Sequence, residues 1–141
     1  MEEKIYDVFK NMNKKLTARE ASMLSPLQLA YIGDAVYELF IRTYLLERDL
    51  PVHELHKEAI KYVKAKAQSD IVHELEDELT EEEKAIVKRG RNAKTYSSPK
   101  NAELIDYKYA TGFESLIGFL YLTGRQERMM ELFQKIVLEY N

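Results

Sequence analysis

Two acidic residues lie in strongly apolar stretches, where an unpaired charge is costly. Asp34 is in the middle of residues 25–49, and Glu114 lies between Gly112 and Gly118 in a second apolar stretch. A carboxylate removed from water is tolerated when it is paired or bound to a metal ion. Mg²⁺ suits two such carboxylates, because it takes oxygen ligands and shares them with water and substrate phosphates. Next to a phosphodiester, the ion would activate an attacking water and stabilise the leaving oxygen.

Each acid also has a plainer interpretation. Asp34 could be a buried acid satisfied by a tyrosine hydroxyl or an arginine, and Glu114 could be a satisfied or partly exposed acid. The residue types alone leave both interpretations open, because they do not establish that the two carboxylates meet.

The first acid lies in a predicted long helix over residues 25–49. Ser25 offers an N-cap oxygen, Pro26 suits the first helical position, and Gln28 completes a capping box. Pro51 cannot continue the helix. Apolar residues occupy most of its circumference, so we expect neighbours to pack around it on all sides, with its central acid inside the protein.

The remaining segments also predict helices. A second buried helix is expected from about residue 101 to 122, ended by Gly124, and no segment shows the alternation of a strand. Shorter helices are expected over residues 3–14, 53–66, 67–79, 80–89 and 126–139, with a helical turn beginning at Thr17. We therefore expect a single all-α domain over residues 1–141, with two buried helices at its centre.

Basic residues gather between the two acid-bearing stretches. Gly90 is expected to stop a helix, and Arg91–Lys100 has the composition of an exposed loop. Such a loop can reach phosphates through charge-assisted hydrogen bonds, and duplex RNA is read through its shape, phosphates and 2′-hydroxyls. A solvated charged loop is the plainer alternative. The candidate RNA-binding residues are Lys88, Arg89, Arg91, Asn92 and Lys94.

The composition limits the class of protein. The chain has 141 residues, a common size for one domain, and no cysteine, which excludes disulfides and thiolate metal sites. Its net charge of −3 argues only weakly against an RNA partner, because acidic and basic residues are segregated along the chain. It shows neither a signal peptide nor a membrane-spanning stretch, so we expect a cytoplasmic protein with no membrane partner.

Other candidate sites are weaker. His53 and His56 have a spacing that can bind zinc, but nothing completes the site, so both are interpreted as surface residues. Four lysines lie in the helix expected over residues 53–66, and the first three of them share one face. They could be a solvated face or contact RNA, and the sequence leaves this open. These lysines are Lys57, Lys61, Lys64 and Lys66.

Four motifs occur in the order of a known family. LAYIGDAVYEL (29–39) resembles LEFLGDAVLEL, the signature of the ribonuclease III catalytic domain. KRGRNAK (88–94), SSPKNAE (97–103) and YATGFESLIGFLYL (109–122) follow it. The chain is most similar to the Mini-III branch, bacterial proteins made of that domain alone. A ribonuclease III-like helical fold without a double-stranded-RNA-binding domain is therefore expected.

The resemblance also implies roles for particular residues. Asp34 and Glu114 fall on catalytic acids that bind Mg²⁺ in the family, with Mn²⁺ as a substitute. Two further family acids are absent, because Ala30 stands in place of a glutamate and Thr111 in place of an aspartate. Water or Glu38 could fill the gap, or Glu38 could simply pair with a basic neighbour.

The implied function is that of a metal-dependent endoribonuclease that cleaves double-stranded RNA. The family works as a homodimer, with one site per subunit. For the Mini-III branch the implied substrate is the precursor of 23S ribosomal RNA, presented with help from a large-subunit ribosomal protein. The alternative is a non-catalytic RNA-binding or ribosome-assembly factor on the same fold, which the two missing acids favour. A helical adaptor that binds only proteins is a third possibility.

Overall fold

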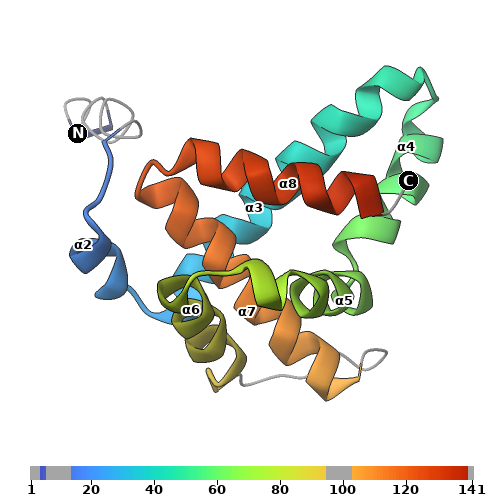
Figure 1. Cartoon of the computed structure of the whole chain (residues 1–141). Helices are drawn as coiled ribbons and strands as arrows, with labels where there is room; N and C mark the ends of the chain where they lie inside the picture. The colour runs from blue at the N-terminus through green and yellow to red at the C-terminus, as the bar shows by residue number, and fades with distance from the viewer. Residues whose placement is uncertain (1–3, 6–13, 95–102, 140–141) are drawn as a thin grey trace.

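Helices α3 and α7 carry the two candidate acids and cross near the middle of the structure (Figure 1). The structure is a computed structural model that describes residues 4–5, 14–94 and 103–139, and no strand occurs among them. The predicted all-α fold class is confirmed. The helices are α2 (Ala18–Ser22), α3 (Pro26–Leu45), α4 (Val52–Val63), α5 (Ala65–Leu75), α6 (Glu81–Arg91), α7 (Leu104–Leu122) and α8 (Gln126–Glu139), with 3₁₀ turns at Leu46–Arg48 and Glu76–Glu78.

The predicted helix starts are largely confirmed. Ser25 Oγ accepts a hydrogen bond from the backbone N–H of Gln28 at 3.1 Å, and Gln28 Oε1 accepts one from the backbone N–H of Ser25 at 2.9 Å. Thr17 and Thr80 begin α2 and α6 with the same reciprocal arrangement. The helix expected over residues 3–14 lies outside the described residues except for positions 4 and 5. In the described part of the chain, no helix is long and apolar enough to span a membrane.

Helix α3 is buried along one face only. Tyr37 and Ile41 are fully buried, whereas Tyr31 is 79% and Leu39 is 67% exposed, and Asp34 is exposed as well. The prediction that neighbours surround α3 is therefore wrong within one copy of the chain. An apolar composition predicts that a surface avoids water, but it does not identify what covers that surface.

Helix α7 is the buried centre of the fold, as predicted. It packs against α2, α3, α5, α6 and α8, so it occupies the interior between them (Figure 1). Its last turn ends before Gly124, which has a φ of +71°. The buried residues of α7 are Ala110, Thr111, Gly112, Phe113, Ser115, Leu116, Ile117, Gly118, Phe119 and Leu120.

Two glycines allow α3 and α7 to approach closely. A Cβ atom on Gly33 would lie 1.7 Å from the carbonyl oxygen of Glu114, and one on Gly118 would lie 1.9 Å from that of Leu29. Both distances are far below contact, so the backbones of the two helices touch at this crossing. Glycine at position 33 lowers the intrinsic stability of the helix, but it permits this contact. The contact places the neighbouring Asp34 next to α7.

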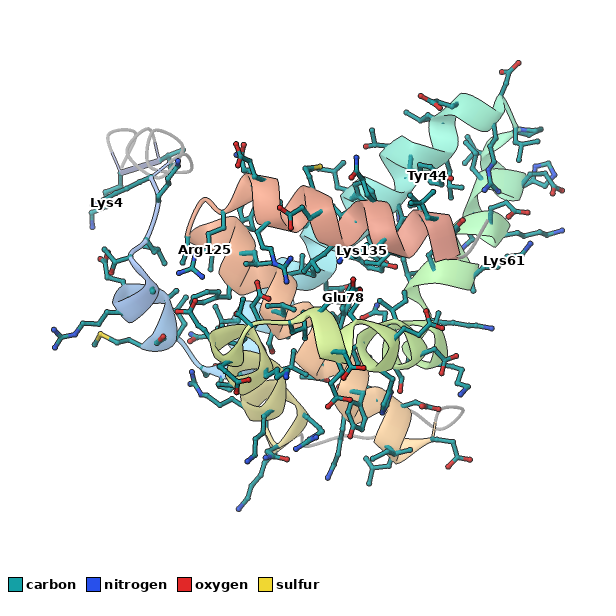
Figure 2. All side chains as sticks on the ribbon, in the orientation of Figure 1. Lys4, Tyr44, Lys61, Glu78, Arg125 and Lys135 are labelled. Atoms are coloured by element: carbon teal, nitrogen blue, oxygen red, sulfur yellow. The ribbon has the colours of Figure 1, made fainter. Side chains whose placement is uncertain are left out.

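An ion pair with a buried glutamate connects α6 to α8. Glu83 is 2% exposed, and its carboxylate accepts hydrogen bonds from Arg128 at 2.8 and 2.9 Å. Burial alone would raise the pKa of Glu83, but hydrogen bonds from Arg128 and Thr80 hold that pKa below its ordinary value. In the same region Lys135 of α8 pairs with Glu78 (Figure 2). These contacts hold α8 against the turn before α6.

Candidate active site

Asp34 of α3 and Glu114 of α7 lie next to each other at the helix crossing. Asp34 is exposed and Glu114 is half-buried, and the two carboxyls are close enough for Asp34 to change the pKa of Glu114. Burial and the charge of Asp34 raise the pKa of Glu114 to about 8. Two carboxylates that share a partly desolvated site favour a proton or a cation between them. The sequence placed Asp34 inside the protein, whereas the structure places it at the surface above Glu114.

Glu38 and Thr111, the other two positions considered for metal binding, both have partners elsewhere. Glu38 adds negative charge that also raises the pKa of Glu114, but its carboxylate forms an ion pair with Arg42 at 3.5 Å. Thr111 is buried, and its hydroxyl donates to the carbonyl of Tyr107 at 3.0 Å. The side chain that replaces a family acid at position 111 is therefore engaged with its own helix.

The donor set fits an ion that keeps much of its water. Among the residues that the structure describes, no three histidine, aspartate or glutamate side chains gather closely enough to hold a metal. Mg²⁺ does not require such a cage, because it is commonly bound by one or two carboxylates, several waters and substrate phosphates. The pair Asp34 and Glu114, which opens to solvent on the Asp34 side, meets that requirement.

The basic residues begin in the last turn of α6, which includes Arg91, although the sequence predicted a loop from that residue onward. Lys88, Arg89 and Arg91 are helical, Asn92 caps the helix, and Lys94 follows. The predicted helix end at Gly90 is therefore wrong. Residues 95–102, with most of the SSPKNAE motif, lie outside the described residues.

Gly90 continues the helix because it lies at a close helix contact. A Cβ atom there would lie 2.6 Å from Ser115 Oγ and 2.8 Å from the Cα atom of Gly112. The sequence pattern cannot separate a glycine that ends a helix from one that lets a neighbour approach. This contact packs the basic turn of α6 onto the stretch of α7 that contains Glu114.

The basic side chains of this turn are not equivalent. Lys88 and Arg89 are exposed. Arg91 donates to the Tyr109 hydroxyl at 3.2 Å and lies over its ring, with the guanidinium carbon 5.3 Å from the ring centre. A cavity of about 260 Å³ opens beside them. Its lining includes Lys84, Lys88, Arg91, His73 and Tyr109.

The lysines of α4 and α5 mostly have acidic partners. Lys61 pairs with Glu58 at 3.2 Å, and Lys66 pairs with Asp70 at 3.0 Å. Figure 2 shows Lys61 extending outward from α4. These contacts favour the interpretation of a solvated, self-neutralised face. His53 and His56 are exposed, as predicted.

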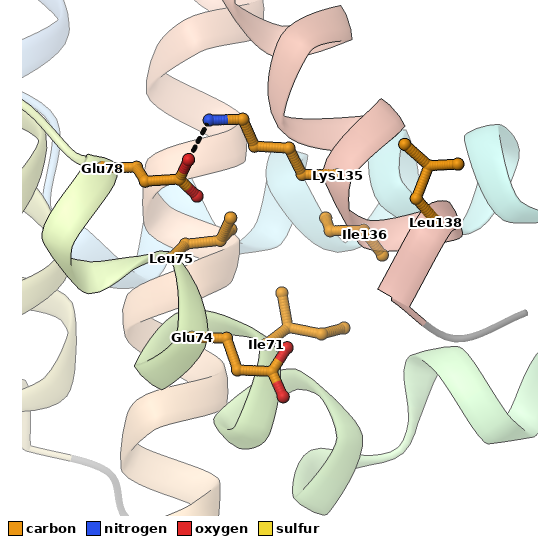
Figure 3. A pocket seen from close by; sticks show the side chains of 7 residues that line it. All are labelled: Ile71, Glu74, Leu75, Glu78, Lys135, Ile136 and Leu138. Atoms are coloured by element: carbon orange, nitrogen blue, oxygen red, sulfur yellow. Dashed lines mark hydrogen bonds and ion pairs between the residues drawn. The ribbon is translucent and has the colours of Figure 1, made fainter.

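A further cavity, of about 360 Å³, lies between α5 and α8. Its floor is apolar, and its edge carries Glu74 and Glu78, the latter paired with Lys135 (Figure 3). Acidic side chains at the mouth do not suit a polyanion. The Asp34–Glu114 pair does not line this cavity.

Sequence reasoning missed one polar residue near the acids. Gln68 of α5 is 2% exposed, and its side chain lies near enough to the Glu114 carboxyl to lower the pKa of that group. A signal was present, because Gln68 lies on the helix face that also carries Ala67, Ile71 and Val72. A glutamine at an apolar position of an amphipathic helix indicates a buried polar contact.

Comparison with known proteins identifies the family. The profile of the ribonuclease III domain matches residues 27–125, a span that contains both candidate acids and the basic turn. The chain belongs to the ribonuclease III domain family. Members of this family are nucleases that generally depend on a divalent metal, and membership makes the chain an endoribonuclease acting on double-stranded RNA.

Individual relatives support the same family assignment. The chain is 52% identical to a Mini-ribonuclease 3 of Thermoanaerobacter sp. (strain X514), over 86% of this chain and 87% of the relative. It is 47% identical to a Mini-ribonuclease 3 of Clostridium tetani, over 92% and 87%. An X-ray structure of a Fusobacterium nucleatum protein superposes with a TM-score of 0.78 at 35% identity, over 84% of this chain and 96% of that one.

Proposed function

We propose that Asp34 and Glu114 are the catalytic acids and that together they hold Mg²⁺, for which Mn²⁺ can substitute. The observation that carries the proposal is the meeting of these two carboxyls at the α3–α7 crossing, where both helices are in backbone contact. A bound divalent ion would lower the pKa of an attacking water and stabilise charge on the leaving oxygen. Hydrolysis then leaves a 5′-phosphate and a 3′-hydroxyl.

The two acids have different environments and therefore different tasks. Asp34 is exposed, so it faces the side from which a phosphodiester arrives. Glu114 is half-buried and has a raised pKa, so it must release its proton when it binds a cation. The last turn of α6 would position the RNA backbone through the exposed Lys88 and Arg89, with Arg91, Asn92 and Lys94 beside them.

The RNA-binding role predicts a specific salt effect. Replacing both Lys88 and Arg89 with alanine should weaken duplex RNA binding at low salt and reduce the salt dependence of binding by about one to two counterions, because each phosphate contact releases a counterion. The paired Lys61→Ala, Lys66→Ala variant is the control. Binding measured by fluorescence anisotropy across a salt series tests this. Parallel salt dependences for wild type and the Lys88/Arg89 variant would contradict the role.

A second copy of the chain is the proposed partner on the open face of α3. Leu27, Tyr31, Ala35 and Leu39 recur every four residues and are all exposed within one copy. Such a row is the kind of helix ridge that packs into the groove of another helix. A two-fold dimer also matches the local two-fold symmetry of an RNA duplex, with one site for each strand. Asp34 borders the row, so both sites would lie near the dimer axis.

The dimer is expected to depend on this row. Leu39→Glu should convert the dimer into a folded monomer, because it would bury a charge at the interface. Val52→Glu, at an apolar residue that is 81% exposed on α4, is the matched control and should remain dimeric. Sedimentation equilibrium measures both masses. A wild-type protein that stays monomeric at micromolar concentration, or a dimeric Leu39→Glu variant, would contradict the proposal.

The substrate and partner are proposed from the similarity of the chain to the Mini-III branch. We propose that the chain acts as one catalytic domain over residues 1–141, in the cytoplasm, on the precursor of 23S ribosomal RNA, with a large-subunit ribosomal protein presenting the substrate. Incubation of the pure protein with this precursor and with an unrelated duplex, with and without Mg²⁺, tests the proposal. Mg²⁺-dependent cleavage at fixed positions of the precursor supports it. Binding without cleavage would favour the ribosome-assembly alternative.

A further inference from the structure

The side-chain amide of Gln68 makes a hydrogen bond through its nitrogen, whereas its oxygen has no hydrogen-bond partner among the described residues. Nε2 donates to the carbonyl of Val63, the last residue of α4, at 2.8 Å. This bond fixes the orientation of the amide, because exchanging its two ends would place two oxygens in contact. The direction of Oε1 therefore follows from the fold.

The oxygen of this amide is buried without a hydrogen bond. Gln68 is 2% exposed, and Oε1 has no partner among the described residues. A buried polar atom without a partner is costly, and in native proteins it commonly marks a bound water, an ion or a functional role. The missing partner must be a donor or a cation, because an amide oxygen only accepts.

The side-chain amide of Gln68 belongs to the same cluster as the two acids. Its N–H group interacts with the Glu114 carboxyl and opposes the rise in the pKa of Glu114, so Oε1, which is part of the same planar amide, lies near that carboxyl. Helix α5, which carries Gln68, packs against α7, and α7 packs against α3. Oxygen-bearing side chains from three helices thus converge, and the amide contributes an oxygen without adding a third negative charge.

We propose that Gln68 is a metal ligand of this enzyme, its Oε1 binding the divalent cation held by Asp34 and Glu114. The inference rests on the proposed function. It supplies a neutral oxygen in a site that lacks two of the family's acids, at Ala30 and Thr111. Amide oxygens are accepted ligands of hard divalent cations.

Titration calorimetry of Mn²⁺ into the metal-free full chain tests the assignment without using activity. Gln68→Met, which keeps the side-chain length but removes the oxygen, should weaken Mn²⁺ binding at least about ten-fold. Gln68→Glu restores an oxygen but cannot donate to Val63, and it should bind Mn²⁺ as tightly as wild type or more tightly. Gln134→Met, at an exposed glutamine of α8, should bind like wild type.

The two substitutions at Gln68 separate a ligand from a structural residue. If the Val63 bond were the only role of Gln68, Gln68→Met and Gln68→Glu would lose Mn²⁺ affinity equally, and that result would overturn the inference. Wild-type affinity in Gln68→Met would also overturn it. Thermal denaturation without metal checks folding. Should Gln68→Met fail to fold, retained or raised affinity in Gln68→Glu supports the inference and reduced affinity overturns it.

Asp34→Asn distinguishes this inference from the proposed function. Loss of Mn²⁺ binding in Asp34→Asn together with wild-type binding in Gln68→Met would leave the proposed metal site intact and remove only Gln68 from it. Equal Mn²⁺ binding by wild type and Asp34→Asn would overturn both.

Discussion

Asp34→Asn is expected to lower the rate of duplex RNA cleavage by about a thousand-fold or more. Metal-ion stabilisation of a hydrolytic transition state is worth several kcal/mol, and every 1.36 kcal/mol corresponds to a factor of ten in rate. Asparagine has nearly the same shape as aspartate but no charge. Because Asp34 is exposed, the exchange removes little packing, and the helical fold should persist. Single-turnover cleavage at saturating Mg²⁺ measures the effect.

The control for this substitution is Asp77→Asn, at an exposed aspartate of the turn before α6. It should cleave RNA like wild type, with an unchanged circular dichroism spectrum for both variants. A rate for Asp34→Asn within ten-fold of wild type would exclude Asp34 as a metal-binding catalytic acid.

The pH dependence of metal binding offers an independent view of the same site. Burial and the charge of Asp34 raise the pKa of Glu114 to about 8, so near neutral pH a cation must displace a proton. Metal affinity should therefore increase with pH up to about 8 and level off above it, and Glu114→Gln should remove most of this dependence. The raised pKa also means that ionising Glu114 destabilises the metal-free fold as the pH rises from about 4.5 towards 8.

Gly33→Ala is expected to destabilise the fold by more than about 4 kcal/mol, among the larger effects of a single substitution. The new Cβ would lie 1.7 Å from the Glu114 carbonyl oxygen, and neither backbone can yield unless the α3–α7 crossing opens. The loss is a large fraction of a typical domain stability of about 5–15 kcal/mol. Urea denaturation followed by circular dichroism measures the change.

The direction of the change in stability shows whether position 33 is packed against another backbone. In an exposed helix the same exchange would stabilise by about 1 kcal/mol, because alanine favours the helix over glycine. Ala85→Gly, at an exposed alanine of α6, is the reverse control and should destabilise by about that amount. An unchanged or raised urea midpoint for Gly33→Ala would mean that the two helices do not touch there.

Local patterns determined much of this protein before its fold was known. Capping residues and apolar spacing are interactions within one helix, so Ser25, Thr80 and Gly124 marked ends that the structure retains. The motif around Asp34 and the one around Glu114 indicated a ribonuclease III domain for the same reason, since both are contiguous in the chain. Residue types alone also selected these two acids as unusual.

Only the tertiary structure decided which distant residues meet. The exposure of Asp34 and the contact of Gly90 with α7 depend on neighbours from other parts of the chain, so the predictions of a fully enclosed α3 and of a helix stop at Gly90 were wrong. The ion pair between Glu83 and Arg128 also joins residues that are far apart in the chain. The burial of the unpaired Gln68 oxygen likewise depends on neighbouring helices. Helix crossings with backbone contact bring Asp34 and Glu114, eighty residues apart, to one place, and short-range periodicity carries no information on such crossings.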